Sequence, residues 1–295
     1  MHLRKELKIK LKRKKTMNDI DIIIPVHEYN QIVEELLRNA INSVVEAQKN
    51  YAHGVLRCLI VYTPNVEDTN MLNDMKTYFG EKIEINSVKN VADTDFCSQI
   101  NFAVDNVKAD FFSILEFDDE YTPKWFNMAH DYYYGNETIS MFIPVNLNHD
   151  ENGKWEYGNT MALSPAFITP DANDKDDIGI INRLRLENCS VFNVTGAIIN
   201  TQDFIRCGKY KHSVKVAFNY ELLLRMTGKY ELKAMVVPKE GYIHYSGRAG
   251  SLTDEYRKTI SEDEVTKWFG LALRESIYAD DREKDISTVK EEKVK

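Results

Sequence analysis

The sequence is poor in the residues that staple small secreted proteins or build fibrous ones. Its 295 residues include 4 cysteines, 7 prolines and 13 glycines. Cysteines 58, 97, 189 and 207 lie far apart and form no C-x-x-C pair. This excludes a disulfide scaffold and the usual spacing of zinc ligands. We therefore expect reduced, mostly buried thiols in a cytoplasmic protein.

Long apolar runs are also missing. A typical run, Ile20–Val26, contains Asp21 and is far shorter than the roughly 20 residues that span a bilayer. This argues against an integral membrane protein. The chain is 43% hydrophobic and 28% charged, a composition that supports a sizeable core and excludes overall disorder.

Positive charge is scarce outside the first residues. Residues 1–16 carry a net charge of +7 and the rest of the chain a net charge of −15. An acidic body disfavours nucleic acid, since duplex binding depends on neutralising phosphates. The basic segment could hold DNA or an anionic membrane, but we favour a disordered leader over residues 1–17. Met17 precedes the first predicted strand, so residues 1–16 need not belong to the natural protein. A charged, flexible tail is predicted over residues 280–295.

Apolar runs and helical spacings alternate along the first part of the chain. This alternation predicts an α/β fold with a mostly parallel central sheet flanked by helices. A polar stretch over residues 148–177 predicts a long loop with one or two short strands, and a C-terminal helix is expected over residues 256–279. The predicted strands are Ile20–Val26, Val55–Tyr62, Lys82–Val88 and Asp110–Phe117, and the helices between them are Ile32–Gln48, Thr69–Phe79 and Asp95–Val107.

Four acids within five residues lie at the end of the last of these strands. In the run Glu116-Phe117-Asp118-Asp119-Glu120, strand alternation would put Glu116 and Asp118 on one side. Two carboxylates there repel each other unless a cation lies between them, and hard oxygen ligands suit Mg²⁺ or Mn²⁺. The alternative is a solvated acidic turn.

Five segments, in order, resemble motifs of family 2 glycosyltransferases. The first, IDIIIPVHEYN, is similar to the family's opening strand and loop. The second contains a helix Asn, a D-x-D-type motif in the form Glu116-Phe117-Asp118, and a following Pro. The other three resemble the family's glycine-containing strand, its E-D-x-D-L-x-x-R segment and its C-terminal H/R…G-S-L segment. The segments are Ile20–Asn30, Asp95–Pro123, Val194–Gly208, Phe218–Met226 and His244–Leu252.

The resemblance implies a GT-A (Rossmann-like) domain over residues 18–255. Its nucleotide-sugar-binding half would cover residues 18–125 and its acceptor half residues 126–255. The implied donor is a nucleotide-diphosphate sugar, a UDP-sugar first, with Mn²⁺ or Mg²⁺ as cofactor. The implied metal ligands are Glu116, Asp118 and His244. The implied donor-binding residues are Pro25, Val26, His27, Glu28, Tyr62, Thr63, Asn101, Glu116, Phe117 and Asp118.

One departure affects the expected chemistry. Asn219 stands where the family carries the Asp that deprotonates the acceptor in an inverting transfer, and an amide cannot act as that base. Glu221 is then the candidate base. Alternatively, the N-x-E segment formed by Asn219 and Glu221 resembles that of some retaining enzymes, or the chain is an inactive sugar- or partner-binding protein. The acceptor remains open among a glycan, a lipid carrier, a protein and modified nucleic acid, as does the oligomeric state.

Overall fold

The computed structural model describes residues 16–67, 70–91, 95–164, 179–181, 183–188, 190, 192–211, 214, 216–246 and 260–274. The predicted tail, nearly all of the predicted leader, Cys189 and residues 247–252 of the last motif lie outside this part of the chain. The predicted C-terminal helix is described over residues 262–274. Among the described helices, none combines the length and apolarity needed to cross a bilayer.

The first half of the chain forms four parallel strands. They are β1 (Ile20–Val26), β2 (Leu56–Tyr62), β3 (Glu84–Lys89) and β4 (Phe111–Ile114), joined in the order β3-β2-β1-β4. β1 pairs with β2 along its whole length, from Ile20 opposite Leu56 to Val26 opposite Tyr62. The carboxyl ends of these strands therefore meet at one edge, where open α/β sheets bind ligands.

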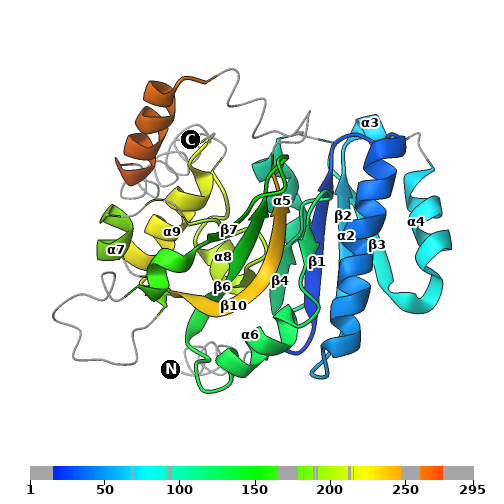
Figure 1. Cartoon of the computed structure of the whole chain (residues 1–295), viewed down its shortest axis with the longest axis horizontal. Helices are drawn as coiled ribbons and strands as arrows, with labels where there is room; N and C mark the ends of the chain where they lie inside the picture. Colours follow the sequence, from blue (N-terminus) through cyan, green and yellow to red (C-terminus); the bar gives the residue numbers. More distant parts are fainter. Residues whose placement is uncertain are drawn as a thin grey trace, which may run out of the picture.

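The second half extends the same sheet as β4-β9-β6-β10-β5. Figure 1 shows β6 and β10 on one side of β4, and β1, β2 and β3 on the other. Strand β9 is antiparallel to both neighbours, whereas β6 and β10 run parallel to each other. The predicted α/β architecture with a mostly parallel central sheet is therefore confirmed. These strands are β5 (Glu120–Tyr121), β6 (Ile139–His149), β9 (Ile198–Asn200) and β10 (Lys233–Tyr245), with β7 (Trp155–Gly158) beside β6 and β8 (Ile180–Ile181) beside β10.

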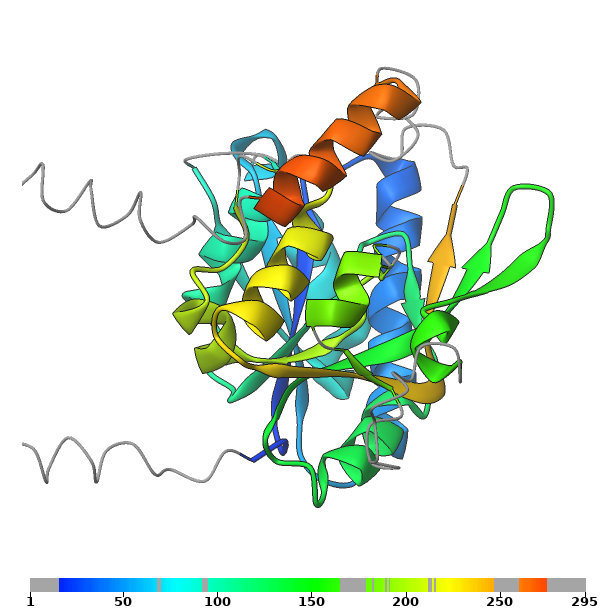
Figure 2. The same cartoon turned by 90° about the vertical axis from the view of Figure 1, so that its left-hand side faces the viewer.

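Helices cover both faces of the sheet. In β1, Ile22 and Ile24 belong to one core cluster and Ile23 to the other, because successive strand side chains point to opposite faces. Figure 2 shows α2 and α9 on opposite sides of the sheet. The first cluster holds α2 (Gln31–Asn50), α4 (Met71–Phe79) and α6 (Trp125–Tyr133), and the second holds α5 (Phe96–Val104), α8 (Thr201–Arg206) and α9 (Phe218–Gly228). Two short helices, α3 (Pro64–Glu67) and α7 (Arg183–Asn188), and the turns η1 (Gly80–Lys82) and η2 (Thr160–Leu163) complete the described elements of this domain.

The charge inside the first strand is compensated. The Asp21 carboxylate is 5% exposed and accepts a 2.7 Å hydrogen bond from Arg57 Nε. Its second oxygen accepts from the backbone N–H groups of Lys108 and Ala109, at 2.7 and 3.1 Å. A buried carboxylate is tolerated only when it is paired and hydrogen-bonded. These bonds meet that need, and they link β1 to β2 and to the backbone just before β4.

Candidate functional site

Three loops come together at the carboxyl edge of the parallel strands. Thr63, after β2, donates from Oγ1 to the His27 carbonyl at 3.0 Å and from its backbone N–H to the Val26 carbonyl at 3.3 Å. The His27 ring lies 5.7 Å from the ring of Phe117, after β4. The predicted donor-binding residues Val26, His27 and Thr63 therefore lie together, and His27 lies beside the predicted acidic motif. Of the others in this group, Pro25 is buried and Glu28 is exposed.

The acidic motif forms a turn, contrary to our expectation of a strand. β4 ends at Ile114, and the Asp119 N–H donates to the Glu116 carbonyl at 3.1 Å. Glu116 and Asp118 therefore do not share a strand face as predicted, although their carboxylates do lie close together. Carboxylate oxygens of Glu116, Asp118 and Asp119 lie within 4.8 Å of one another. The turn thus adds Asp119 to the pair that was singled out.

Strand pairing brings His244 to this turn from 125 residues away. In the antiparallel pair of β5 and β10, Tyr121 lies opposite Tyr242 and Glu120 opposite Ile243. The next position in this register sets Asp119 against His244, and Asp119 Oδ2 lies 2.9 Å from His244 Nδ1. The Tyr245 N–H donates to the other Asp119 oxygen at 2.9 Å. His244 is therefore held beside the acids by Asp119.

Burial and repulsion perturb both charged groups. Burial raises the pKa of Glu116 to about 8, and the negative charges of Asp119 and Asp118 act in the same direction. Burial lowers the pKa of His244, but its hydrogen bond to Asp119 and the nearby carboxylates outweigh burial and raise the pKa to about 9. Crowded carboxylates of this kind fit a hard divalent cation, which supplies the missing positive charge.

The acidic turn is held in place by contacts from the segment before β9 and from β10. Thr195 Oγ1 donates to Glu116 Oε1 at 3.4 Å, and the Glu116 N–H donates to the Tyr242 hydroxyl at 3.1 Å. Gly196 has a φ of +77°, and a Cβ there would lie 2.4 Å from the Tyr242 ring. Its carbonyl accepts from the indole N–H of Trp125 at 2.9 Å. Only glycine fits this position, because Tyr242 must pass close to the backbone.

Asn101 serves a different contact from the expected one. Its side-chain amide donates to the Tyr210 carbonyl at 2.8 Å and accepts from the Tyr210 N–H at 2.9 Å. These two bonds fasten α5 to the segment that follows α8. The structure therefore uses Asn101 as a backbone clamp.

The two candidate catalytic residues lie at the start of α9. The Asn219 side-chain oxygen accepts from the Tyr210 hydroxyl at 3.1 Å. Glu221 is fully buried, with Arg225 donating to its two oxygens at 2.8 Å each and Lys211 Nζ 2.9 Å from one of them. Both oxygens of this buried carboxylate are occupied by Arg225 and one also by Lys211, which leaves neither oxygen directed at a substrate hydroxyl. The structure thus places Glu221 in a buried ion-pair network, where we had expected a candidate base.

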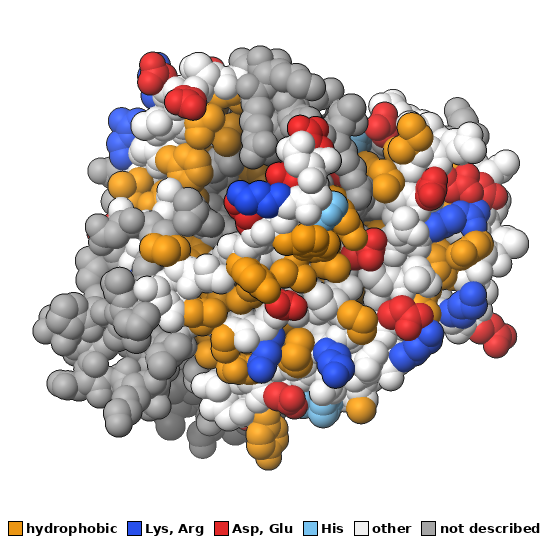
Figure 3. Space-filling model, in the orientation of Figure 1, with side chains coloured by type: hydrophobic (Ala, Val, Ile, Leu, Met, Phe, Trp, Pro, Cys, Tyr) orange, Lys and Arg blue, Asp and Glu red, His pale blue; other side chains and the backbone are white. Residues whose placement is uncertain are grey.

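Two exposed aromatic residues of strand β7 lie near the candidate site. In Figure 3, apolar side chains gather across the middle of the face on which β7 and β10 lie. Trp155 and Tyr157 of β7 are 52% and 63% exposed, and the Trp155 ring lies 4.5 Å from the His149 ring, which in turn neighbours Tyr245. Exposed aromatic rings offer flat faces on which sugars or other ring systems can stack.

Three residues of the site were not singled out from the sequence. Asp119 belongs to the run of acids that was noted in the sequence, so this run could have identified it. Thr195 and Tyr242 contact Glu116 from positions 79 and 126 residues away. Thr195 lies within the motif-like segment Val194–Gly208, but nothing in the sequence pairs either residue with Glu116, because their role depends on how β9 and β10 join the sheet.

The β3-β2-β1-β4 sheet, the acidic turn after β4 and the extension through β9, β6 and β10 define a GT-A fold. Crystal structures of S. aureus TarS share it. The structure of TarS residues 1–349 in complex with UDP-GlcNAc superposes with a TM-score of 0.56 at 10% sequence identity, covering 80% of this chain and 60% of that one. The complex of the same fragment with UDP gives a TM-score of 0.53 at 11% identity, covering 78% and 61%.

The chain thus spans about 60% of the TarS fragment. No protein-family model matches the chain, and no curated protein matches it. At this level of identity the likeness establishes the fold.

Proposed function

We propose that the chain is a metal-dependent glycosyltransferase that moves a sugar from a nucleotide-diphosphate sugar, with a UDP-sugar as the first candidate donor, to an acceptor hydroxyl. The observation that carries this proposal is the cluster of Glu116, Asp118 and Asp119 at the carboxyl edge of a GT-A sheet. The complexes of TarS with UDP-GlcNAc and UDP support the choice of donor.

Glu116, Asp118 and Asp119 would hold the cation. Mn²⁺ or Mg²⁺ bound there would offset the charge that develops on the leaving nucleotide diphosphate. The chain's own residues would orient the donor: His27 and Phe117 form one wall of the site, and Thr63 fixes the loop that carries His27. Asp119 fixes His244 through Nδ1, which leaves the other ring nitrogen of His244 to act as a ligand or proton donor.

The decisive experiment is calorimetric binding of UDP and other nucleoside diphosphates, with and without Mn²⁺. We expect Mn²⁺-dependent binding to the wild type and its loss in the Glu116→Gln/Asp118→Asn variant. The matched control is Glu156→Gln, which changes an exposed carboxylate on β7 and should bind as the wild type does. Failure of every diphosphate to bind the wild type would overturn the proposal.

A second candidate is a GT-A-like protein that binds a sugar nucleotide or partner without catalysis. It is favoured by one specific observation: Asn219 has no basic atom, and Glu221 is neutralised by Arg225 and Lys211. A retaining transferase, which needs no such base, is equally compatible with this observation. Release of UDP from a UDP-sugar in water separates the two candidates, because a transferase leaks sugar to water and a binding protein releases no UDP.

A further inference from the structure

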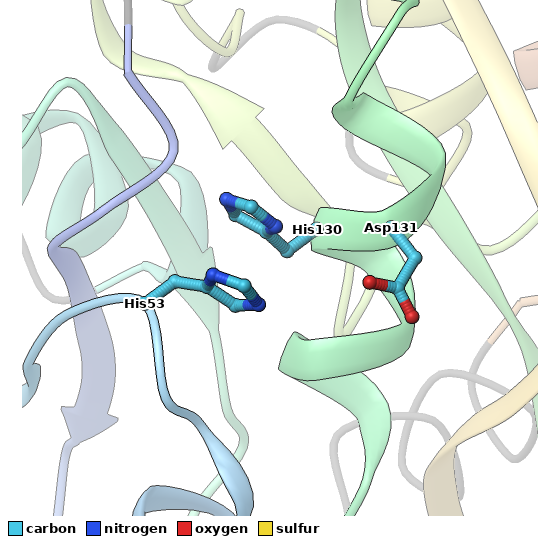
Figure 4. Close-up of side chains that lie close together, drawn as sticks. All are labelled: His53, His130 and Asp131. Carbon is cyan, nitrogen blue, oxygen red and sulfur yellow. The ribbon is translucent and has the colours of Figure 1, made fainter.

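A second group of metal-ligating side chains lies at the opposite edge of the sheet. His53 is in the segment between α2 and β2, and His130 and Asp131 are on α6. Figure 4 shows the two imidazole rings one over the other with the Asp131 carboxylate to one side, and a ligand atom from each residue lies within 4.8 Å of the others. His53 lies three residues before β2 begins, at the amino edge of the parallel strands, whereas the acidic turn follows the carboxyl end of β4.

The two imidazole rings are stacked. Their centroids are 3.5 Å apart and their planes are inclined by 8°. The Tyr51 ring meets both edge-on, at 5.7 Å from His53 and 6.4 Å from His130. Tyr51 is itself anchored, because its hydroxyl donates to the Met17 carbonyl at 2.6 Å. The two histidine rings therefore pack against a tyrosine ring whose position is fixed.

One nitrogen of this group has an unmet hydrogen-bonding capacity. Nδ1 of His130 is buried and has no hydrogen-bond partner among the described residues. A buried polar atom without a partner costs free energy, and a bound ion would remove that cost. Burial lowers the pKa of His130, and the neighbouring His53 acts in the same direction. The ring is therefore neutral near pH 7, as a ligand must be.

The ligand chemistry differs from that of the acidic turn. Two imidazole nitrogens and one carboxylate oxygen form a borderline donor set that zinc favours, with water completing the coordination. Three carboxylates suit Mg²⁺ or Mn²⁺ instead. We propose that His53, His130 and Asp131 form a zinc site that fastens the segment between α2 and β2 to α6.

Zinc binding requires the rings to separate. A nitrogen lone pair lies in the plane of its ring, so two parallel rings cannot both point at one ion. His53 is exposed and lies outside any helix or strand, so its side chain has room to rotate. His130 is held on α6 within the aromatic cluster. Zinc should therefore replace the stacked pair with two rings that converge on the ion and on Asp131.

The test measures zinc affinity of the full chain by competition with a chromophoric chelator. The Glu116→Gln/Asp118→Asn background weakens the acidic turn as a competing site, because it removes two of the three carboxylates there. In that background we expect one zinc ion per chain at micromolar or lower concentration. His53→Ala and Asp131→Asn, both at exposed positions, should each weaken binding at least tenfold. His149→Ala, which changes another histidine beside an aromatic ring, should leave the affinity within twofold.

Thermal unfolding gives a second readout. Zinc should raise the melting temperature of the His149→Ala control and not that of His53→Ala, because only a ligand bound to the folded chain stabilises it. Equal melting temperatures of these variants without zinc would show that His53→Ala folds normally. Absence of micromolar zinc binding, or a His53→Ala affinity within twofold of its parent, would overturn the proposal.

Discussion

Asp119 and His244 form the contact that joins the two halves of the candidate site. The Asp119 carboxylate lies 2.9 Å from His244 Nδ1 and accepts the Tyr245 N–H at the same distance. Asp119 is 1% exposed and the His244 side chain 25% exposed, so salt screens this contact only in part. Through it, the acidic turn after β4 is fixed to the end of β10. The charge state of the turn is therefore coupled to the stability of the domain.

The first prediction concerns the pH dependence of stability without divalent cation. The pKa of Glu116 is raised to about 8 and that of His244 to about 9. Each group therefore keeps a proton in the folded state at pH values where the unfolded chain has lost it. By linkage, their contribution is fully present below the unfolded pKa values and is lost as pH rises through the folded ones. The melting temperature in EDTA should fall between pH 5 and pH 9.

The slope can be assigned with two variants. One proton contributes at most about 1.4 kcal/mol per pH unit, so Glu116→Gln should give a visibly flatter profile. Glu156→Gln, on the exposed β7 strand, should keep the wild-type slope. A cation that holds the carboxylates ionised should also flatten the wild-type profile. An equally steep decline in Glu116→Gln and the wild type would contradict this assignment.

The second prediction concerns Gly196. Alanine there meets two costs: a φ of +77°, which is unfavourable for a residue with a Cβ, and a contact 2.4 Å from the Tyr242 ring. Gly135→Ala is the matched control, because its φ is +92° and nothing lies within 4 Å of the added carbon. In urea unfolding, Gly196→Ala should be destabilised by about 1–3 kcal/mol more than Gly135→Ala.

The displaced Tyr242 should also disturb the site. Its hydroxyl accepts the Glu116 N–H at 3.1 Å, so Gly196→Ala should weaken Mn²⁺-dependent diphosphate binding, while Gly135→Ala should leave it unchanged. If both variants lose the same free energy of unfolding, then the nearby Tyr242 ring does not prevent a larger residue at position 196.

Elements that depend on neighbouring residues could be predicted from the sequence, whereas features that depend on distant residues could not. β1 begins and ends at the predicted residues, because a run of apolar residues closed by Pro25 is a local pattern. Helix α2 exceeds its predicted bounds by one residue at the start and two at the end, since its apolar spacing is also local. The acidic residues after β4 were found, but the sequence did not show that the strand ends at Ile114 and that the acids form a turn closed by the Asp119 N–H and the Glu116 carbonyl.

Longer-range contacts could not be predicted in this way. The clamp of Asn101 on Tyr210 spans 109 residues, so a helix asparagine looked like a donor-binding residue. The contact of His244 with Asp119 depends on the register of β5 and β10. Glu221 looked like a base because its two cations belong to another segment and to the next turn of its own helix.

The third prediction separates a structural from a catalytic role of Glu221. Its carboxylate is fully buried, and Arg225, 1% exposed, donates to both of its oxygens. Glu221→Gln leaves the Arg225 charge buried without a counter-charge. Because breaking a buried ion pair is costly, we expect a loss of about 3 kcal/mol in the free energy of unfolding.

Glu187→Gln is the control for this change. Glu187 pairs with Arg183 at 2.9 Å with the same i,i+4 spacing, but its side chain is 44% exposed. Exposed pairs contribute little, so its loss should stay below about 1 kcal/mol. Urea unfolding measures the stability of both variants. UDP binding and UDP-sugar hydrolysis are then measured at a temperature where each variant is folded. Together these measurements distinguish a structural role of Glu221 from a catalytic one. If Glu221→Gln unfolds at the wild-type urea concentration, binds UDP normally and loses hydrolysis, then Glu221 is the base and the ion-pair interpretation is wrong. If it is destabilised and its folded fraction binds and hydrolyses normally, Glu221 holds α9 in place and the proton acceptor must be sought elsewhere.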